Sequence, residues 1–227
     1  LLYWEDFTSR RAAFLRDETT GATSYVDLPV DSTDGWGNAS YTLSGGHDLW
    51  VLGGGNVVWL RHYALDGAGA VPTSARLLSA QQLGDADSRV DDVISLASGA
   101  IVVVWHQQGS AGPQGLGIGY VSPAGAWSAM PLLQFMPTRS SKSVVAQHPA
   151  DGSIWLFNDP DAWGQIGAAH LTEVAGGLRV DWTDAGFLTT NVYGTSGPDP
   201  ENPDLAVARD MSAGQLVLAY QSAERRI

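Results

Sequence analysis

At four places along the chain, a tight turn is followed by a short run of alternating or β-branched apolar residues. These runs begin at Leu49, Ile101, Ile154 and Leu216, at spacings of 52, 53 and 62 residues, and a similar run begins at Leu1, 48 residues before the first. A period of about 50 residues is typical of arrays in which every repeat is one small structural unit, such as the blade of a propeller. The repeat therefore constrains the chain to an array of similar units.

The central copy of the repeat, residues 92–133, shows what one unit contains. It carries four short strand signals separated by turn signals, at residues 93–96, 101–105, 116–121 and 127–133. Four such strands in sequence describe an antiparallel meander. No window of 11 or more residues has a convincing helical period. The sequence predicts an all-β fold, a β-propeller built of four-stranded antiparallel blades.

The same reading predicts the domain organisation. We expect one propeller domain over residues 1–227, with approximate blades at 1–30, 39–80, 91–134, 142–185 and 203–227. The first unit lacks its first strand and the last has only its first two, whereas a closed ring of four-stranded blades needs a multiple of four strands. We therefore expect this chain to be an incomplete portion of a larger propeller, with the remainder of a longer chain as its partner.

Charge and composition exclude several classes of function. The net charge is -12, and an acidic surface repels phosphate backbones, so nucleic acid is not expected as a partner. No stretch approaches the roughly 18 consecutive apolar residues of a membrane helix, so membrane insertion is not expected. The chain has no cysteine, which excludes disulfides and thiolate metal sites.

Two hairpins between third and fourth strands carry a recognisable pattern. Residues 21–25 read GATSY and residues 122–127 read SPAGAW. Both are similar to degenerate forms of the S-x-D-x-G-x-T-W motif, and neither has the aspartate in register. The repeat thus resembles the sialidase-like (BNR or Asp-box type) β-propeller superfamily. The resemblance implies an extracellular location, or one on a cell or virion surface, and a glycoside hydrolase as one possible activity.

The resemblance also implies which groups a sialidase would need. Three arginines would clamp a substrate carboxylate, because the planar guanidinium matches a carboxylate with two hydrogen bonds. No local signature gathers such a triad from the arginines of the chain; the candidates are Arg10, Arg11, Arg61, Arg89, Arg139 and Arg209.

Two tryptophans differ from the other seven because they lie in expected loops. Trp36 lies beside Asp34, and Trp163 lies beside Asp161, in segments rich in Asp, Asn and Gly. An indole can stack on the apolar face of a sugar ring while neighbouring polar groups bind its hydroxyls. We predict a carbohydrate-binding site at these four residues. The alternative is that each indole folds back and covers its own loop.

The same loops offer a weaker alternative, a calcium site. Asp31 and Asp34 in one loop, and Asp159 and Asp161 in the other, supply the oxygen ligands that a hard cation prefers. Neither loop has the EF-hand spacing, and Asp-rich turns also form without metal. No cofactor is therefore predicted, with calcium kept as an alternative.

Histidines provide the candidates for catalysis. His62, His106, His148 and His170 each lie in or beside a strand of a different unit, so they could line one funnel. Polysaccharide lyases on propellers use histidine as a base, because its pKa is near neutral. His106 is the first candidate since it follows Trp105 at a strand end. The alternative is that such a histidine is a half-buried polar side chain with no catalytic role.

Three functional hypotheses follow. The first is an extracellular or surface propeller that binds carbohydrate or a protein partner through its loops. The second is a glycoside hydrolase or polysaccharide lyase of sialidase-like propeller type. The third is a structural module of a larger assembly, because a propeller fold alone does not decide among these.

Overall fold

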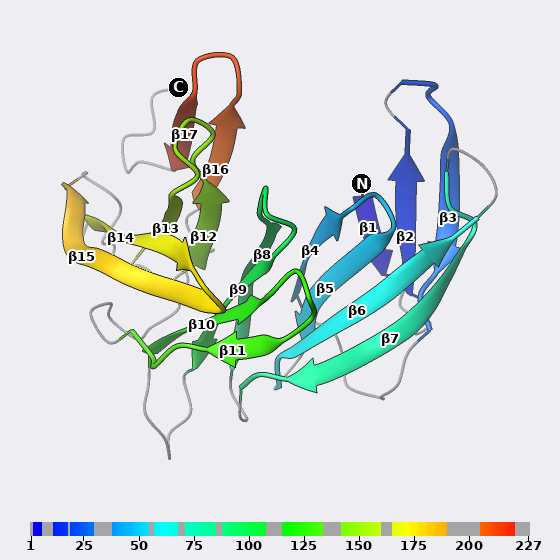
Figure 1. Ribbon diagram of the computed structural model, residues 1–227, viewed down its shortest axis with the longest axis horizontal. Helices are drawn as coiled ribbons and strands as arrows, with labels where there is room; N and C mark the ends of the chain where they lie inside the picture. Colours follow the sequence, from blue (N-terminus) through cyan, green and yellow to red (C-terminus); the bar gives the residue numbers. More distant parts are fainter. Residues whose placement is uncertain are drawn as a thin grey trace, which may run out of the picture.

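The computed structural model shows a chain built from antiparallel sheets (Figure 1). It describes residues 2–5, 11–17, 19–29, 38–54, 57–67, 71–84, 88–107, 115–133, 142–159, 165–189 and 205–220. Within these ranges every regular element is a strand, and consecutive strands pair with each other in five sheets.

Each sheet is one blade, and the blades follow one another along the chain. The first blade holds β1 (Leu2–Glu5), β2 (Arg11–Arg16) and β3 (Thr23–Asp27). The second holds β4 (Asn38–Ser44), β5 (Asp48–Gly54), β6 (Trp59–Asp66) and β7 (Ser74–Gln82). The third holds β8 (Arg89–Ser95), β9 (Ile101–Gln107), β10 (Gly115–Val121) and β11 (Trp127–Ala129). The fourth holds β12 (Lys142–Gln147), β13 (Ile154–Asp159), β14 (Gln165–Val174) and β15 (Gly177–Thr189), and the fifth holds β16 (Leu205–Asp210) and β17 (Gln215–Tyr220).

The blades pack face to face because side chains alternate between the two faces of a strand. Leu49 and Val51 of β5 pack against the first blade, whereas Trp50 and Leu52 pack against the third. A further apolar cluster joins the third and fourth blades, and another joins the fourth and fifth. Each fully buried Val, Leu or Ile side chain contributes about 1.5–3 kcal/mol, so these four clusters supply most of the stabilisation between blades.

In the second to fifth blades the first strand is innermost. Figure 1 shows β4, β8, β12 and β16 near the middle of the arc and β7, β11 and β15 at its outside. Stacked four-stranded meanders with the first strand innermost form a β-propeller, and the predicted fold class is confirmed. The turn-and-run signals used to detect the repeat coincide with the starts of β5, β9, β13 and β17.

Glycines in β10 make room for two indoles. A Cβ atom at Gly117 would overlap the ring of Trp105, and one at Gly119 would overlap the ring of Trp127. The two glycines therefore let both indoles lie directly on the backbone of β10, on the face toward the second blade. In the sequence GLGIGYV of β10 (Gly115–Val121), Leu116, Ile118 and Tyr120 thus lie on one apolar face. The three glycines lie on the other face, which is flat because they have no side chain.

The outermost strand of the third blade is shorter than predicted. The expected strand at 127–133 ends at Ala129, and Leu133 only forms an isolated bridge with Leu116. Pro131 lies between them, and proline has no N–H to donate to the ladder. β15 extends over 13 residues, Gly177–Thr189, and bulges shift its pairing with β14.

Candidate functional site

A cavity of about 730 Å³ lies between the inner strands β4, β8, β12 and β16. Each of these strands is the edge of its sheet, so one side of its backbone has no strand partner. The cavity is lined mainly by residues of these four strands, and its charged lining residues are Asp91, Asp92 and Arg209.

Side chains of neighbouring inner strands take up the unpaired backbone N–H groups. Thr42 Oγ1 on β4 accepts a hydrogen bond from the N–H of Ser95 on β8 at 3.1 Å. Gln147 Oε1 on β12 accepts one from the N–H of Ala97, just after β8, at 2.8 Å. Ser40 also contacts the N–H of Val93, and Asp92 the N–H of Val145, so the paired positions rise together and β4, β8 and β12 run in the same direction. We call the end of the blades where these inner strands begin the top end.

Asp92 joins three inner strands. Its Oδ1 accepts a hydrogen bond from Ser40 Oγ on β4 at 2.8 Å, and its Oδ2 accepts one from the N–H of Val145 on β12 at 3.0 Å. Oδ1 also accepts a bond from the N–H of Val93 at 2.9 Å. Burial raises the pKa of the Asp92 carboxyl, and these hydrogen bonds act in the opposite direction. The carboxylate is thus committed to holding the blades together.

A second buried carboxylate, Asp91, lies in a bulge of β8 and pairs with His106. The distance between His106 Nδ1 and Asp91 Oδ2 is 2.6 Å, and the two side chains are 2% and 3% exposed. Asp91 also accepts hydrogen bonds from the backbone and hydroxyl of Ser143, and Ser143 Oγ accepts one from Asn158 Nδ2 at 2.8 Å. Burial raises the pKa of Asp91, and the contact with His106 opposes this shift. The result is a buried polar network between the third and fourth blades.

The other strand histidines also pair with aspartates, each in its own place. His62 Nε2 lies 2.7 Å from Asp48 Oδ1, and the imidazole stacks on Trp50 at 3.9 Å between ring centroids. His170 Nδ1 lies 2.9 Å from Asp181 Oδ2.

His148 completes the set, with its Nδ1 3.2 Å from Asp151 Oδ1. These three histidines and His106 lie on separate elements, and none of them lines the cavity between the inner strands. The expectation that they share one funnel is therefore wrong. Each imidazole instead supports its own part of a blade.

The His–Asp pairs were missed by the sequence reading, although a signal exists. Asp48 lies two residues before Trp50, and Trp50 lies opposite His62 in the ladder. Residues in this diagonal relation are within reach of each other across an antiparallel pair. A search for Asp at diagonal positions from each strand histidine would have found this pair.

The predicted ligand-binding residues Trp36, Trp163, Asp34 and Asp161 lie outside the described residues, as does Asp31. Asp159 ends β13, and only its backbone is described. Described residues beside the loops that carry Trp36 and Trp163 nevertheless show where each loop attaches. Asn38 begins β4 opposite Gly54, and Asp159 lies opposite Lys142, which begins β12. Both loops therefore attach at the top end.

Of the arginines considered for a carboxylate clamp, the structure places three in different surroundings. Arg61 is fully buried, and its guanidinium lies 5.5 Å from the centre of the Trp59 ring. Arg89 begins β8, and Arg209 lies beside the cavity on β16. These three arginines lie on three different strands, β6, β8 and β16.

Two kinds of feature are absent from the described ranges. No group of three or more His, Asp or Glu side chains there could hold a metal ion. No helix there is long and apolar enough to span a membrane.

The comparisons with known proteins add no activity. No protein-family model matches the chain, and no curated protein matches it. Among solved structures, the chain is similar to a protein from Lactobacillus plantarum at 11% identity, over 96% of this chain and 73% of that one, with a TM-score of 0.42.

Proposed function

We propose that this protein is an extracellular or surface β-propeller that binds a carbohydrate through two loops at its top end. The observation that supports the proposal is that the loops carrying Trp36 and Trp163 attach at the same end of the blades. Two indoles with adjacent carboxylates, Asp34 and Asp161, can then act on one ligand. The resemblance of the repeat to sialidase-like propellers remains part of the proposal. It concerns how the blades are built.

The ligand is a neutral glycan. With a net charge of -12, the protein repels sialylated and uronate polymers, because like charges disfavour encounter at long range. A neutral sugar carries no such penalty, and its apolar ring face suits an indole.

The buried state of His106 argues for binding without turnover. A general base must come within hydrogen-bond reach of the proton that it removes. The His106 imidazole is 2% exposed and its Nδ1 contacts Asp91, so it serves the network between blades. Binding of a glycan without turnover requires no general base.

A glycan array followed by calorimetry tests the proposal. We expect a neutral oligosaccharide to bind, and Trp36→Ala and Trp163→Ala each to weaken binding about tenfold, since an aromatic contact contributes about 0.5–1.5 kcal/mol beyond its buried area. Trp182→Ala is the matched control, because this exposed tryptophan lies on the outer strand β15 and its loss leaves the top end intact.

Each other outcome has a clear meaning. Unchanged affinity in both loop variants would overturn the proposed site. Hydrolysis or elimination of the bound glycan would replace binding with the lyase or hydrolase hypothesis. Absence of any glycan binding would leave the protein partner or the structural module as the function of the propeller.

A further inference from the structure

Two aspartates in the described part of the chain are followed directly by glycine, Asp66 and Asp151. Such a pair of residues can rearrange, because glycine has no Cβ and its backbone nitrogen is the least hindered of all. That nitrogen can attack the side-chain carboxyl carbon of the aspartate and close a five-membered ring. Both aspartates lie at the end of the blades opposite the top end, where β6 ends and where β12 turns into β13.

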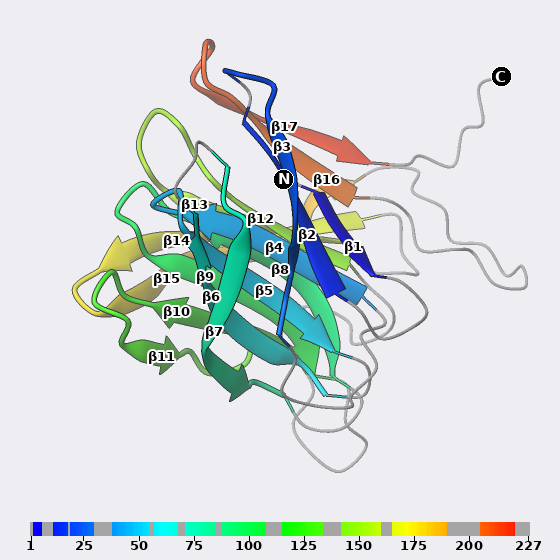
Figure 2. The same cartoon turned by 90° about the vertical axis from the view of Figure 1, so that its right-hand side faces the viewer.

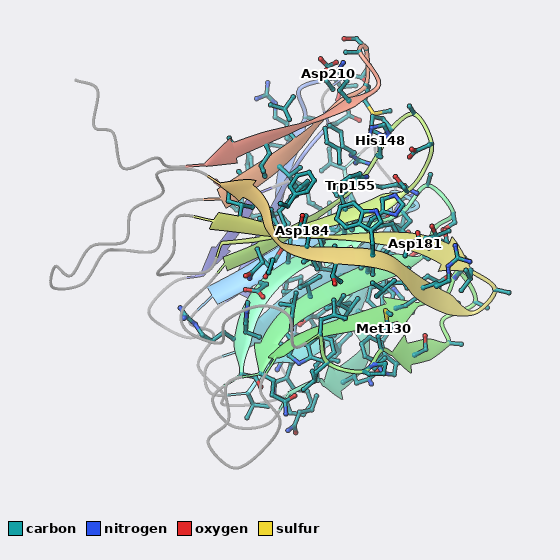
Figure 3. The ribbon with its side chains drawn as sticks, turned by 90° about the vertical axis from the view of Figure 1, so that its left-hand side faces the viewer. Met130, His148, Trp155, Asp181, Asp184 and Asp210 are labelled. Atoms are coloured by element: carbon teal, nitrogen blue, oxygen red, sulfur yellow. The ribbon has the colours of Figure 1, made fainter. Side chains whose placement is uncertain are left out.

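The turn that contains Asp151 restrains both reacting groups. Asp151 Oδ1 accepts hydrogen bonds from the N–H of Ser153 at 2.9 Å and from Ser153 Oγ at 2.6 Å, as in an Asx turn. The attacking nitrogen is also engaged, because the N–H of Gly152 donates to the carbonyl of His148 at 3.0 Å. Figure 3 labels His148 at this turn.

The hydrogen bonds to Asp151 have a second effect. Those from the hydroxyl and the N–H of Ser153 hold the pKa of the Asp151 carboxyl below its ordinary value of 3.8. The group therefore stays ionised, and a carboxylate is a poorer electrophile than a protonated carboxyl. Asp151 is thus protected both by its geometry and by its charge.

Asp66 has the same glycine neighbour without these restraints. Its carboxylate and the N–H of Gly67 form no hydrogen bond or ion pair with any residue that the structure describes. The backbone carbonyl of Asp66 accepts hydrogen bonds from the N–H of Thr73 at 3.0 Å and from Ser74 Oγ at 3.2 Å. These bonds leave the carboxyl carbon and the attacking nitrogen unengaged, and both Asp66 and Gly67 are exposed.

Packing requires the glycine that makes Asp66 reactive. A Cβ atom at Gly67 would lie 3.0 Å from the Cα of Pro72 and 3.0 Å from the nitrogen of Thr73, which is tighter than an ordinary contact. β6 ends, and β7 begins, at the outside of the blade array (Figure 1), and Figure 2 looks onto that side. Water therefore reaches a pair of residues whose glycine the hairpin cannot easily replace.

We propose that Asp66 is a modification site, where the folded protein isomerises to isoaspartate, and that Asp151 is protected from the same change. The site lies at the opposite end of the blades from the proposed glycan loops, so the two proposals stand independently.

The reaction needs only water. The backbone nitrogen of Gly67 forms a bond to Asp66 Cγ, the bond from Cγ to the carboxyl hydroxyl breaks, and this hydroxyl leaves as water with the amide proton of Gly67. A second water then adds to the former backbone carbonyl carbon of Asp66 and breaks its bond to the nitrogen. The main chain now runs through Cβ and Cγ, and the product has the mass of the original protein.

The product lengthens the main chain by one carbon atom at the end of β6. The carbonyl oxygen that accepted hydrogen bonds from Thr73 and Ser74 becomes part of a carboxylate beside the chain. The pairing of Asp66 with Ser74, which begins the β6–β7 ladder, is then altered.

Peptide mapping of the full 227-residue protein, aged at neutral pH, tests the proposal. The tryptic peptide 62–76 contains Asp66 as its only aspartate, and peptide 143–179 contains Asp151. Electron-transfer fragmentation distinguishes isoaspartate from aspartate at each position. We expect isoaspartate to accumulate several times faster at Asp66 than at Asp151 in the folded protein. In concentrated urea the two rates should become similar, because each aspartate then has only its glycine neighbour.

Asp66→Glu is the matched variant, since it keeps the charge while ring closure would require a six-membered ring, which forms far more slowly. We expect the isomer of peptide 62–76 to disappear in this variant, and circular dichroism checks that the sheets are retained. Equal rates at the two aspartates in the folded protein would overturn the proposal. So would a folded protein that forms no isoaspartate at Asp66 while the unfolded protein does, or an isomer of this peptide that persists in Asp66→Glu.

Discussion

The Asp92 carboxylate accepts hydrogen bonds from Ser40 on one neighbouring blade and from Val145 on the other. An asparagine at this position keeps the shape but offers one acceptor oxygen, and its amide N–H₂ would face a backbone N–H. We expect Asp92→Asn to lower the free energy of unfolding by about 1–3 kcal/mol, the cost of an unmade buried hydrogen bond. Urea denaturation measures the change.

Asp66→Asn is the matched control for this prediction. Asp66 ends β6 with an exposed side chain, so its variant is expected to stay within about 0.5 kcal/mol of the wild type. A loss at Asp92 no larger than the loss at Asp66 would contradict the role given to Asp92.

Asp181 provides a prediction on pH. Hydrogen bonds from Thr172 Oγ1 and Arg179 Nε hold the pKa of the Asp181 carboxyl below its ordinary value of 3.8. The unfolded chain therefore binds this proton more readily, and stability rises with pH across that window. The contribution is full above the ordinary value and is lost as the pH falls through the lower folded value.

We expect the stability difference between wild type and Asp181→Asn to be constant above pH 3.8 and to shrink below it. Chemical denaturation at a series of pH values measures this. Asp27→Asn, at an exposed carboxyl that ends β3, serves as the control. A difference that grows toward acid would reverse the sign and contradict the assignment.

At the scale of the strand, the packing of β10 depends on two glycines, Gly117 and Gly119, each of which is covered by an indole. A methyl group at Gly119 would overlap the indole of Trp127, which must then leave its place on the sheet. We expect Gly119→Ala to destabilise the protein by about 1–3 kcal/mol, the usual effect of overpacking a core. Thermal or urea unfolding measures it.

Gly177 is the control for this substitution. A Cβ atom at Gly177, which begins β15, would meet only Ser128 Oγ at 3.6 Å, an ordinary contact. Gly177→Ala should leave stability nearly unchanged, and equal losses at the two glycines would argue against the packing described for β10.

The strands could be predicted from sequence because each one carries its own pattern. The run Ile101 to Trp105 reads as a strand without reference to the rest of the chain. Pro131 could also have been used to end the strand that begins at Trp127, since its lack of an N–H is a local property.

The contacts between blades could not be predicted in this way. Ser40 and Val145 are 52 and 53 residues from Asp92, so their hydrogen bonds exist only once the blades are stacked. Aligning the repeats would have placed these three residues at one position of the unit. This alignment is the sequence signal from which the contact between blades could have been predicted. Trp50 and Trp105 are buried between the second and third blades, whereas Trp182 on β15 is 38% exposed.

At the scale of the whole molecule, protection against hydrogen exchange should follow the layering. All seven residues of β10, and all of β9 but Gln107, are buried, since a blade covers each face of the third blade. β16 and β17 hold exposed and partly buried residues, and among the described residues their apolar side chains pack against the fourth blade. We expect the slowest amide exchange in β9 and β10 and the fastest strand exchange in β16 and β17.

Native-state hydrogen exchange with mass spectrometry measures this order. Equal protection in the third and fifth blades would mean that the protein opens only as a whole. It would then contradict the expectation that stability declines toward the end of the array.

The bonds between inner strands have a consequence for how such a chain can change its length. Ser40, Thr42, Asp92 and Gln147 reach from their own inner strands to the backbone of a neighbouring blade, and no main-chain ladder crosses from blade to blade among the described strands. A gene segment that encodes one blade therefore also encodes the side chains that bond this blade to its neighbours. Tandem duplication of that segment would add a blade without redesigning its neighbours.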